Sequence, residues 1–175
     1  MPHPFFIRPA SLDDAVALSD LYARSYPELL PGDYDDAVLE GALPLFTKAQ
    51  PALLSCGTYF VAECAETDDI IGAGGWTDLS PSRGVSGTHL GHVRHVATRP
   101  DWLRRGVARA LIDVSLASAE AHGMREMSCM SSITARDFYA SMGFEETTEV
   151  ELTLAPGVHF PAIQMHRNLC APEYA

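Results

Sequence analysis

Four arginines surround one glycine in the middle of this 175-residue chain. The segment RPDWLRRGVARAL, residues 99–111, begins with the composition of a loop and ends with the apolar spacing of a helix. Cations are unfavourable at the start of a helix, because that end already carries about +0.5 of an elementary charge. The whole chain has a net charge of −11, so a surplus of arginine here needs a local cause. We therefore expect a negatively charged ligand at this turn.

The turn offers the groups that a phosphate or pyrophosphate needs. The first amides of a helix have no partner inside it, and Gly106 and Ala108 leave room for a ligand beside the backbone. Arg104, Arg105 and Arg109 add positive charge around those amides. A basic, solvated helix start with a turn glycine is the alternative interpretation of the same residues.

The strand expected at 88–98 leads into this turn and carries three histidines and an arginine. Strict alternation divides its side chains between two faces, with His92, Arg94, Val96 and Thr98 on one and Val93, His95 and Ala97 on the other. A histidine with a pKa near 6.5 suits taking a proton from an amine, which makes His92 a candidate base. The alternative for His92 is a half-buried strand histidine, and His95 is expected to pack or to support its neighbours. Arg94 cannot act as a base, but its guanidinium can hold a carboxylate.

Hydrophobic periodicity and turn residues predict the elements that position these groups. Strands are expected at 5–10, 58–64, 70–79, 88–98 and 126–132, with a closing antiparallel pair at 144–154 and 160–169. Helices are expected from Ser11 with Asp14 in an approximate capping box, within 33–53 with an interruption near Pro44, from Val107 up to Gly123, and over 134–142. The glycine run 72–75 indicates close packing or a bulge. This order predicts one α/β domain of the α+β type, residues 1–175 with a core at about 5–168, in which about four helices flank a mixed, largely antiparallel sheet.

Two segments carry a family resemblance. VATRPDWLRRGVARAL, residues 96–111, resembles the acyl-CoA-binding signature of the GNAT superfamily of N-acetyltransferases, commonly R/Q-x-x-G-x-G/A. SSITARDFYASMGF, residues 131–144, is similar to the second family signature, usually N-x-x-A-x-x-F/L-Y-x-x-x-G-F. The sequence departs from the family where Leu103 replaces the first Q/R and Ser132 replaces the asparagine, although serine can still cap a helix.

The resemblance implies direct transfer of an acetyl group, in a ternary complex, from acetyl-CoA to a primary amine of a small molecule or peptide. It implies that Tyr139 protonates the leaving sulfur, with a packed aromatic residue as the alternative. His92 is then the candidate base, and Arg94 the candidate that binds an acceptor carboxylate. The residues expected to bind the cosubstrate are Val96, Ala97, Thr98, Arg104, Arg105, Gly106, Val107, Ala108, Arg109, Ser132 and Phe138. A non-catalytic domain that binds or senses acyl-CoA is the alternative function.

Composition places the chain among ordinary soluble globular proteins, with 47% hydrophobic and 20% charged residues. No apolar run approaches the roughly 18 to 20 residues of a membrane span, and the first residues do not follow the pattern of a signal peptide. Because the balance is acidic, nucleic acid is not expected as a partner. No metal site is expected either, since His92 and His95 should point to opposite faces. We expect a cytoplasmic protein with four reduced cysteines, Cys56, Cys64, Cys129 and Cys170.

The sequence leaves the amine acceptor open. The resemblance assigns the acceptor pocket to the first helices and the closing strands, which correspond to 22–50, 80–90 and 145–165. Acidic residues in the first of these segments favour a cationic amine, but a solvated acidic face explains them equally: Glu28, Asp33, Asp35 and Asp36. The use of longer acyl-CoAs and a homodimer formed through the closing strands are also open.

Overall fold

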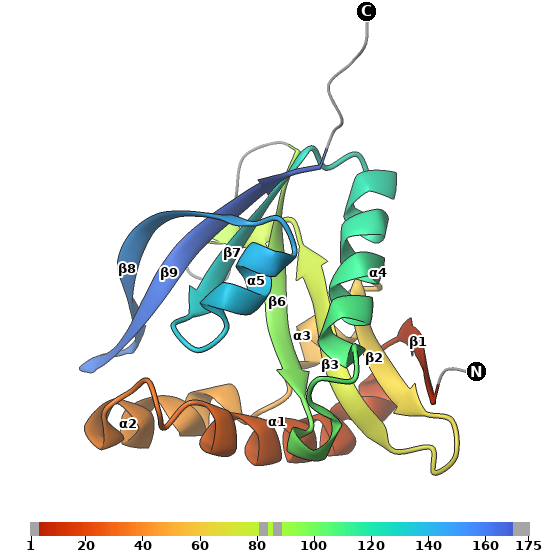
Figure 1. The fold of residues 1–175 in the computed structure, drawn as a ribbon, viewed down its shortest axis with the longest axis horizontal. Coiled ribbons are helices and arrows are strands. Elements are labelled where there is room, and N and C mark those ends of the chain that lie inside the picture. Colours follow the sequence, from red (N-terminus) through yellow and green to blue (C-terminus); the bar gives the residue numbers. More distant parts are fainter. Residues whose placement is uncertain (1–3, 81–83, 86–88, 170–175) are drawn as a thin grey trace, which may run out of the picture.

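The computed structural model describes residues 4–80, 84–85 and 89–169, so Cys170 lies outside the described part. Its main sheet has the strand order β1-β2-β3-β6-β7-β9-β8 (Figure 1). The strands are β1 (Phe5–Pro9), β2 (Tyr59–Cys64), β3 (Ile70–Thr77), β6 (Leu90–Thr98), β7 (Glu126–Ser132), β8 (Glu145–Ala155) and β9 (Val158–Asn168). Only the β6–β7 pair is parallel among these described strands, which confirms a mixed, largely antiparallel sheet. A separate small ribbon pairs β4 (Leu79–Ser80) with β5 (Gly84–Val85).

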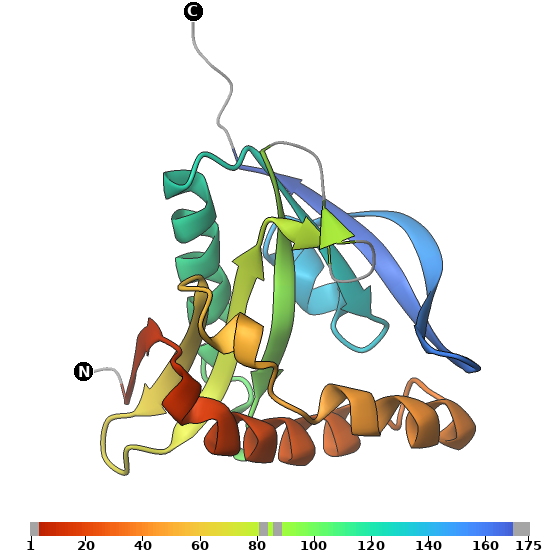
Figure 2. The ribbon, with the colours of Figure 1, turned by 180° about the vertical axis from the view of Figure 1, so that it is seen from behind.

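Helices cover both faces of the main sheet. One face carries α4 (Val107–Ala121) and α5 (Arg136–Ser141), as Figure 1 shows. The other face carries α1 (Ala15–Leu29) and α3 (Pro51–Leu54), and α2 (Asp36–Phe46) extends from α1 towards β9 (Figure 2). The described residues therefore form five α-helices rather than about four, with two 3₁₀ turns at Leu12–Asp14 and Pro100–Trp102.

Two helix predictions have different outcomes. The capping box that precedes α1 is present, since the backbone N–H of Ser11 donates to Asp14 Oδ2 at 2.8 Å. The helical region expected within 33–53 is interrupted, but the break follows Phe46, because Pro44 itself lies inside α2, close to its end. The chain leaves the helix only at 47–50, before the single turn of α3.

The glycine run 72–75 brings α4 close to β3. A Cβ atom added to Gly72 would lie 2.5 Å from Cγ1 of Val107, the first residue of α4. Val107 is itself buried, at 1% exposure, so its side chain anchors the helix start on the sheet. This confirms the expected close packing, and it fixes the position of the arginine-rich turn that precedes α4.

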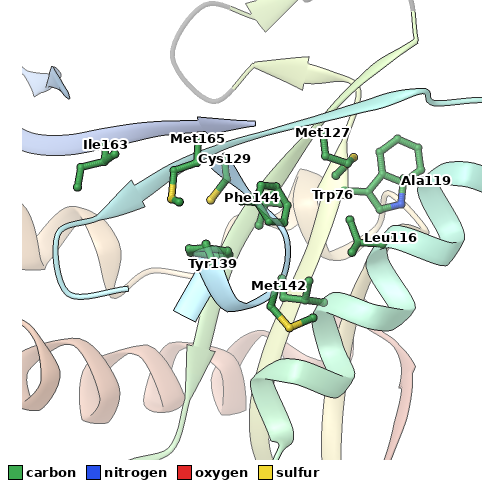
Figure 3. Packing of buried hydrophobic residues seen from close by; sticks show 12 residues of the cluster. Trp76, Leu116, Ala119, Met127, Cys129, Tyr139, Met142, Phe144, Ile163 and Met165 are labelled. Atoms are coloured by element: carbon green, nitrogen blue, oxygen red, sulfur yellow. The ribbon is translucent and has the colours of Figure 1, made fainter. Parts of the chain in front are cut away.

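The buried core is divided between the two faces of the sheet. Beneath α4 and α5, one cluster includes Trp76, Met127 and Tyr139 (Figure 3). Beneath α1, another cluster includes Tyr22, Tyr59 and Ala97. A residue of β6 that packs against the first cluster lies on the α4 and α5 face, and one that packs against the second lies on the α1 face.

A β-bulge changes the expected faces of β6. Arg94 pairs with Gly75 and Ala97 pairs with Ala73. The chain therefore advances three residues along β6 but only two along β3, so β6 carries one extra residue. The extra residue lies at the bulge, where His95 has a φ of +48°. As a result Ala97 packs beneath α1 on the face of His92 and Arg94, whereas Val96 packs against the cluster beneath α4 and α5. The strict alternation predicted for this strand is therefore wrong beyond Arg94.

The β6 and β7 strands are paired along only part of their length. Their ladder runs from Leu90–Glu126 to His92–Ser128, and the strands then diverge (Figure 1). Beyond that point, β7 continues its pairing with β9 as far as Ser132. The backbone of β6 from Val93 to Thr98 is therefore left without a neighbouring strand on its β7 side.

Candidate active site

A pocket of about 570 Å³ opens where β6 and β7 diverge. Its lining includes Tyr26 and Phe46, from α1 and α2 on one side of the sheet. It also includes Ala135 and Tyr139, from the start of α5 and its preceding turn on the other side. The divergence of the strands therefore makes one cavity that elements of both faces line. Such a cavity can hold two reactants against each other.

Tyr139 lines this pocket and is almost completely buried. Burial raises the pKa of its hydroxyl well above the ordinary value of 10, so the group is protonated at neutral pH. Tyr139 belongs to the same buried cluster as Cys129, and burial raises the pKa of the Cys129 thiol to about 12 (Figure 3). The Tyr139 ring packs edge-on against Phe138 and Phe144. Tyr139 is therefore a fixed, neutral proton donor at the pocket wall.

His95 occupies the pocket wall at the β6 bulge. Its Nε2 lies 2.9 Å from the carbonyl oxygen of Phe46 and donates to it, which leaves Nδ1 as the unprotonated nitrogen. The ring stacks on Tyr22 with 4.1 Å between ring centroids. Burial lowers the pKa of His95 to about 4, so the imidazole is neutral at pH 7. These contacts agree with the packing role predicted for His95, and they also place it in the pocket.

Two tyrosines hold the carbonyl groups of the bulge. Tyr26 donates its hydroxyl hydrogen to the carbonyl oxygen of Val96 at 2.9 Å, and Tyr59 donates to that of His95 at 2.6 Å. A bulge leaves backbone groups outside the ladder, and buried carbonyls need such partners. Tyr26 is not among the site residues expected from the sequence, although Tyr22 and Tyr26 have the i, i+4 spacing that places two side chains on one face of a helix.

His92 does not line the pocket with Tyr139. The side chain is buried on the α1 face, where Thr77 is its neighbour on β3, and its Nε2 has no hydrogen-bond partner among the described residues. Burial and the nearby Arg94 guanidinium lower the pKa of His92. The structure therefore does not bring this candidate base to the candidate acid.

Arg94 does line the pocket, from the same face of β6. Its guanidinium donates to the hydroxyl of Thr77 at 3.0 Å. Within residues 4–80, 84–85 and 89–169, no carboxylate forms an ion pair with it. Partial burial lowers the pKa of Arg94, although the group stays charged at any ordinary pH. The pocket therefore presents a positive charge without a counter-charge from the described chain.

The arginine-rich turn has the backbone that a phosphate site requires. Gly106 precedes α4 with a φ of +82°, and space beyond its Cα is open. Arg104 also has a positive φ, of +62°. The Arg105 guanidinium lies over the Trp102 ring, 4.5 Å from its centroid, so this arginine already has a partner. The free amides of α4 therefore face outward from a turn with a special backbone conformation.

The remaining candidate residues lie around these two features. Arg109 lines a second cavity of about 520 Å³ between α4 and the chain after α5, together with Asp113 and Gly143. The Ser132 hydroxyl accepts from the backbone N–H of Ala135 at 3.2 Å, in the turn that precedes α5, whose N-cap residue is Ala135 rather than Ser132. Phe138, Ala108 and Thr98 are partly or fully buried beside the pocket or the turn.

A family model described as an acetyltransferase (GNAT) domain matches residues 48–165, about two thirds of the chain. The chain belongs to the GNAT acetyltransferase family. No curated protein resembles the sequence closely enough to count as a relative.

Solved structures share the GNAT fold along nearly the whole chain. A GCN5-related N-acetyltransferase of Rhodopseudomonas palustris has a TM-score of 0.78 and 20% identity over 96% of this chain and 97% of its own. PaiA N-acetyltransferase of Thermoplasma acidophilum, solved with coenzyme A, has a TM-score of 0.70 and 14% identity over 94% and 98%. The ribosomal-protein-S18-alanine N-acetyltransferase of Escherichia coli has a TM-score of 0.63 and 16% identity over 98% of each chain. The predicted fold class is thereby confirmed.

The far wall of the pocket in this GNAT protein is apolar, which the sequence analysis did not predict. Its residues come from the ends of α1 and α2 and from β8 and β9: Leu30, Leu45, Phe46, Leu152, Leu154 and Phe160. The Phe46 and Phe160 rings meet edge to face, with 4.9 Å between centroids. The segments 22–50 and 145–165 therefore do contribute to the pocket, as the resemblance implied.

The acidic residues considered for a cationic acceptor lie elsewhere on the GNAT domain. All four are exposed, and none of them lines the pocket: Glu28, Asp33, Asp35 and Asp36. Among the described residues, no group of three or more His, Cys, Asp or Glu side chains is placed to hold a metal ion. His92 and His95 share a face after all, but they belong to no such group. None of the helices in the described ranges is long and apolar enough to span a membrane.

Proposed function

We propose that this GNAT protein transfers an acetyl group from acetyl-CoA to a primary amine in a ternary complex. The observation that carries the proposal is the pocket at the divergence of β6 and β7, which elements from both faces of the sheet line. One reactant can enter from the side of α4 and α5, and the other from the side of α1 and α2. Both then meet beside Tyr139.

The cosubstrate fits the features on the α4 side. The amides that follow Gly106 and the charges of Arg104 and Arg109 would hold the pyrophosphate. The backbone between Val96 and Thr98, which has no strand beside it on the β7 side, would pair with the pantetheine arm. Ala97, Arg105, Val107, Ala108, Ser132 and Phe138 complete the proposed binding set. The coenzyme A complex of the similar PaiA protein supports this assignment.

Acetyl transfer joins the amine nitrogen to the thioester carbonyl carbon and breaks the carbon–sulfur bond. Tyr139 would give its proton to the departing sulfur, because burial keeps that hydroxyl neutral. The proton of the amine would leave through water, since His92 lies outside the pocket and His95 is a weak base. Activity should then rise with pH as the acceptor amine loses its proton, and His92→Ala should retain that pH profile. If His92→Ala instead loses activity only at pH 6–7, His92 is the base.

Calorimetry and a thiol-release assay test the proposal together. Acetyl-CoA at about 100 times its Kd should stabilise the fold by roughly 2.7 kcal/mol. Release of free thiol from acetyl-CoA should depend on an added amine. Stabilisation without amine-dependent release would instead support the non-catalytic domain that binds or senses acyl-CoA. An unchanged melting temperature would contradict both functions.

Two further proposals concern the setting of the enzyme. A cytoplasmic location is supported by the free thiols of Cys56, Cys64 and Cys129. A homodimer is supported by the position of β8, which ends the strand order of the main sheet. Size measurement in solution tests the dimer.

A further inference from the structure

We infer that the acceptor is an amino acid with an apolar side chain, whose carboxylate binds Arg94. This inference rests on the proposed acetyl transfer and names the class of its acceptor. Three features of the pocket carry it: a cation that lacks a counter-charge, the absence of acidic side chains from the described lining, and an apolar wall.

The first feature is the guanidinium of Arg94. Partial burial removes part of its hydration, and the hydrogen bond that Arg94 donates within the described chain goes to a neutral acceptor, the Thr77 hydroxyl. Residues 81–88, which follow β4 and precede β6, contain no Asp or Glu in their sequence. A partly buried cation is costly unless an anion pairs with it. A carboxylate on the acceptor would provide that anion and could accept two parallel hydrogen bonds.

The second feature is the charge of the pocket as a whole. Its described lining contains no Asp or Glu, and the other basic side chain, His95, is neutral at pH 7. The net charge of this lining is therefore positive. A polycationic acceptor would meet repulsion from Arg94 with no acidic partner in return, whereas an amine that carries a carboxylate would be attracted.

The third feature is the wall opposite β6. Leu152, Leu154 and Phe160 from the closing strands pack with Phe46, at the end of α2, in one apolar cluster that lines the cavity together with Leu45. Leu45 keeps 41% of its surface exposed and lines the pocket, so an apolar ligand would cover part of that surface. Burial of apolar surface would therefore favour an acceptor with an aliphatic or aromatic side chain.

The spacing along β6 fits an α-amino acid. Arg94 precedes Val96 by two residues, so it lies within about 7 Å, along the strand, of the backbone proposed to pair with the pantetheine arm. In an α-amino acid a single carbon separates the amine from the carboxylate. The amine can therefore lie at the divergence of the strands while the carboxylate reaches the Arg94 guanidinium.

Matched pairs of acceptors test this inference directly. L-leucine and L-phenylalanine are compared with leucinamide and phenylalaninamide, which keep the amine and the side chain but lack the carboxylate. The amino acids should be used with kcat/KM at least about tenfold higher than their amides. Glycine, aspartate and lysine should be poor acceptors, because they bury little apolar surface or add charge.

Substitution of Arg94 locates the effect. Arg94→Ala should raise KM for L-leucine by about 10- to 100-fold, change kcat little and leave leucinamide unaffected. Arg125→Ala removes an exposed arginine at the start of β7 and should change neither substrate. If Arg94→Ala fails to fold, the comparison of leucine with leucinamide in the unaltered protein still decides the matter.

A binding measurement gives a readout that does not depend on turnover. N-acetyl-L-leucine, the expected product, should raise the melting temperature of the coenzyme A-bound protein, whereas N-acetyl-leucinamide should not. Equal use of amino acids and amides would overturn the inference and leave acetyl transfer intact. The inference would also be overturned if the protein binds acetyl-CoA but neither acetylates any apolar amino acid nor binds its N-acetyl product. If acetyl-CoA does not bind, the proposed function itself is contradicted.

Discussion

The two sides of the pocket are built from the chain in different ways. The proposed acetyl-CoA side depends on a continuous segment, in which the turn at Gly106 leads directly into α4. The proposed acceptor side is assembled from the ends of α1 and α2, the bulge in β6, and the strands β8 and β9. In the proposed function the first side would bind mainly through backbone amides, and the second would bind through side chains. A site made by continuous backbone is therefore visible in the sequence, whereas one assembled by tertiary packing is not.

The largest effect is expected where the two sides meet, at Tyr139. Tyr139→Phe keeps the ring that packs against Phe138 and Phe144 but removes the proton donor. The rate of acetyl transfer should fall by about 10²- to 10⁴-fold, while Kd for acetyl-CoA should change less than about tenfold. Single-turnover kinetics and calorimetry measure the two quantities separately.

Tyr34→Phe is the matched control for Tyr139→Phe. The Tyr34 hydroxyl is also bound in the fold, donating to the Pro161 carbonyl at 2.7 Å, but Tyr34 does not line the pocket. Tyr34→Phe should cost stability and leave the rate per folded molecule unchanged. Equal rates in the two variants would show that Tyr139 only packs and that the thiolate departs unassisted.

The next effect belongs to the acceptor side and concerns stability at low pH. The pKa of His95 is about 4 in the fold and near 6.5 in the unfolded chain. Between these values the unfolded chain binds a proton that the folded chain does not, so stability is complete above pH 6.5 and falls as the pH drops towards 4. The greatest loss should be about 3 kcal/mol.

His95→Phe isolates this contribution, because it keeps a ring beside Tyr22 but cannot titrate. The lowered pKa values of His92 and Asp14 act in the same direction and are unchanged by the substitution. Urea unfolding between pH 4 and 7.5 should therefore show a shallower pH dependence in the variant, although Arg94 still faces the site. Parallel curves for the two proteins would mean that His95 titrates normally.

A smaller effect tests the backbone nature of the acetyl-CoA side. Gly106 and Gly123 flank α4 with φ values of +82° and +86°, and an added Cβ meets no atom within 4 Å at either position. Alanine at either site should cost about 1 to 2 kcal/mol of stability through the same backbone strain. Only Gly106→Ala should also weaken acetyl-CoA binding, by about tenfold, because its Cβ would enter the space beside the free amides. Equal binding by both variants would place the pyrophosphate elsewhere.

The sequence predicted the features that depend on local chemistry. The order of helices and strands along the chain, the Ser11–Asp14 capping box and the close approach at Gly72 all follow from residue type and spacing. The β6 bulge could not be predicted from the sequence, because no residue type there indicates an extra residue in the strand. That single insertion moved Val96 and Ala97 to the opposite faces, so His92 no longer shares a face with Val96. The apolar wall was missed for a different reason, since its two groups of residues, 30–46 and 152–160, lie more than 100 residues apart in the sequence and meet only through tertiary packing.

The smallest effect separates side-chain charge from backbone shape within the arginine turn. Arg104 is exposed, so Arg104→Ala should weaken acetyl-CoA binding only about two- to fivefold, and the difference should disappear at high salt. Arg104→Gly removes the same charge but suits the φ of +62° at this position.

The two variants should therefore bind acetyl-CoA equally, while Arg104→Gly should be about 1 kcal/mol more stable than Arg104→Ala. Calorimetry in low and high salt, combined with urea unfolding, measures both differences. A much larger loss of affinity for acetyl-CoA in either variant would show that the side chain of Arg104 binds the pyrophosphate directly. The turn would then bind the pyrophosphate through a side chain, and the difference proposed between the two sides of the pocket would not hold there.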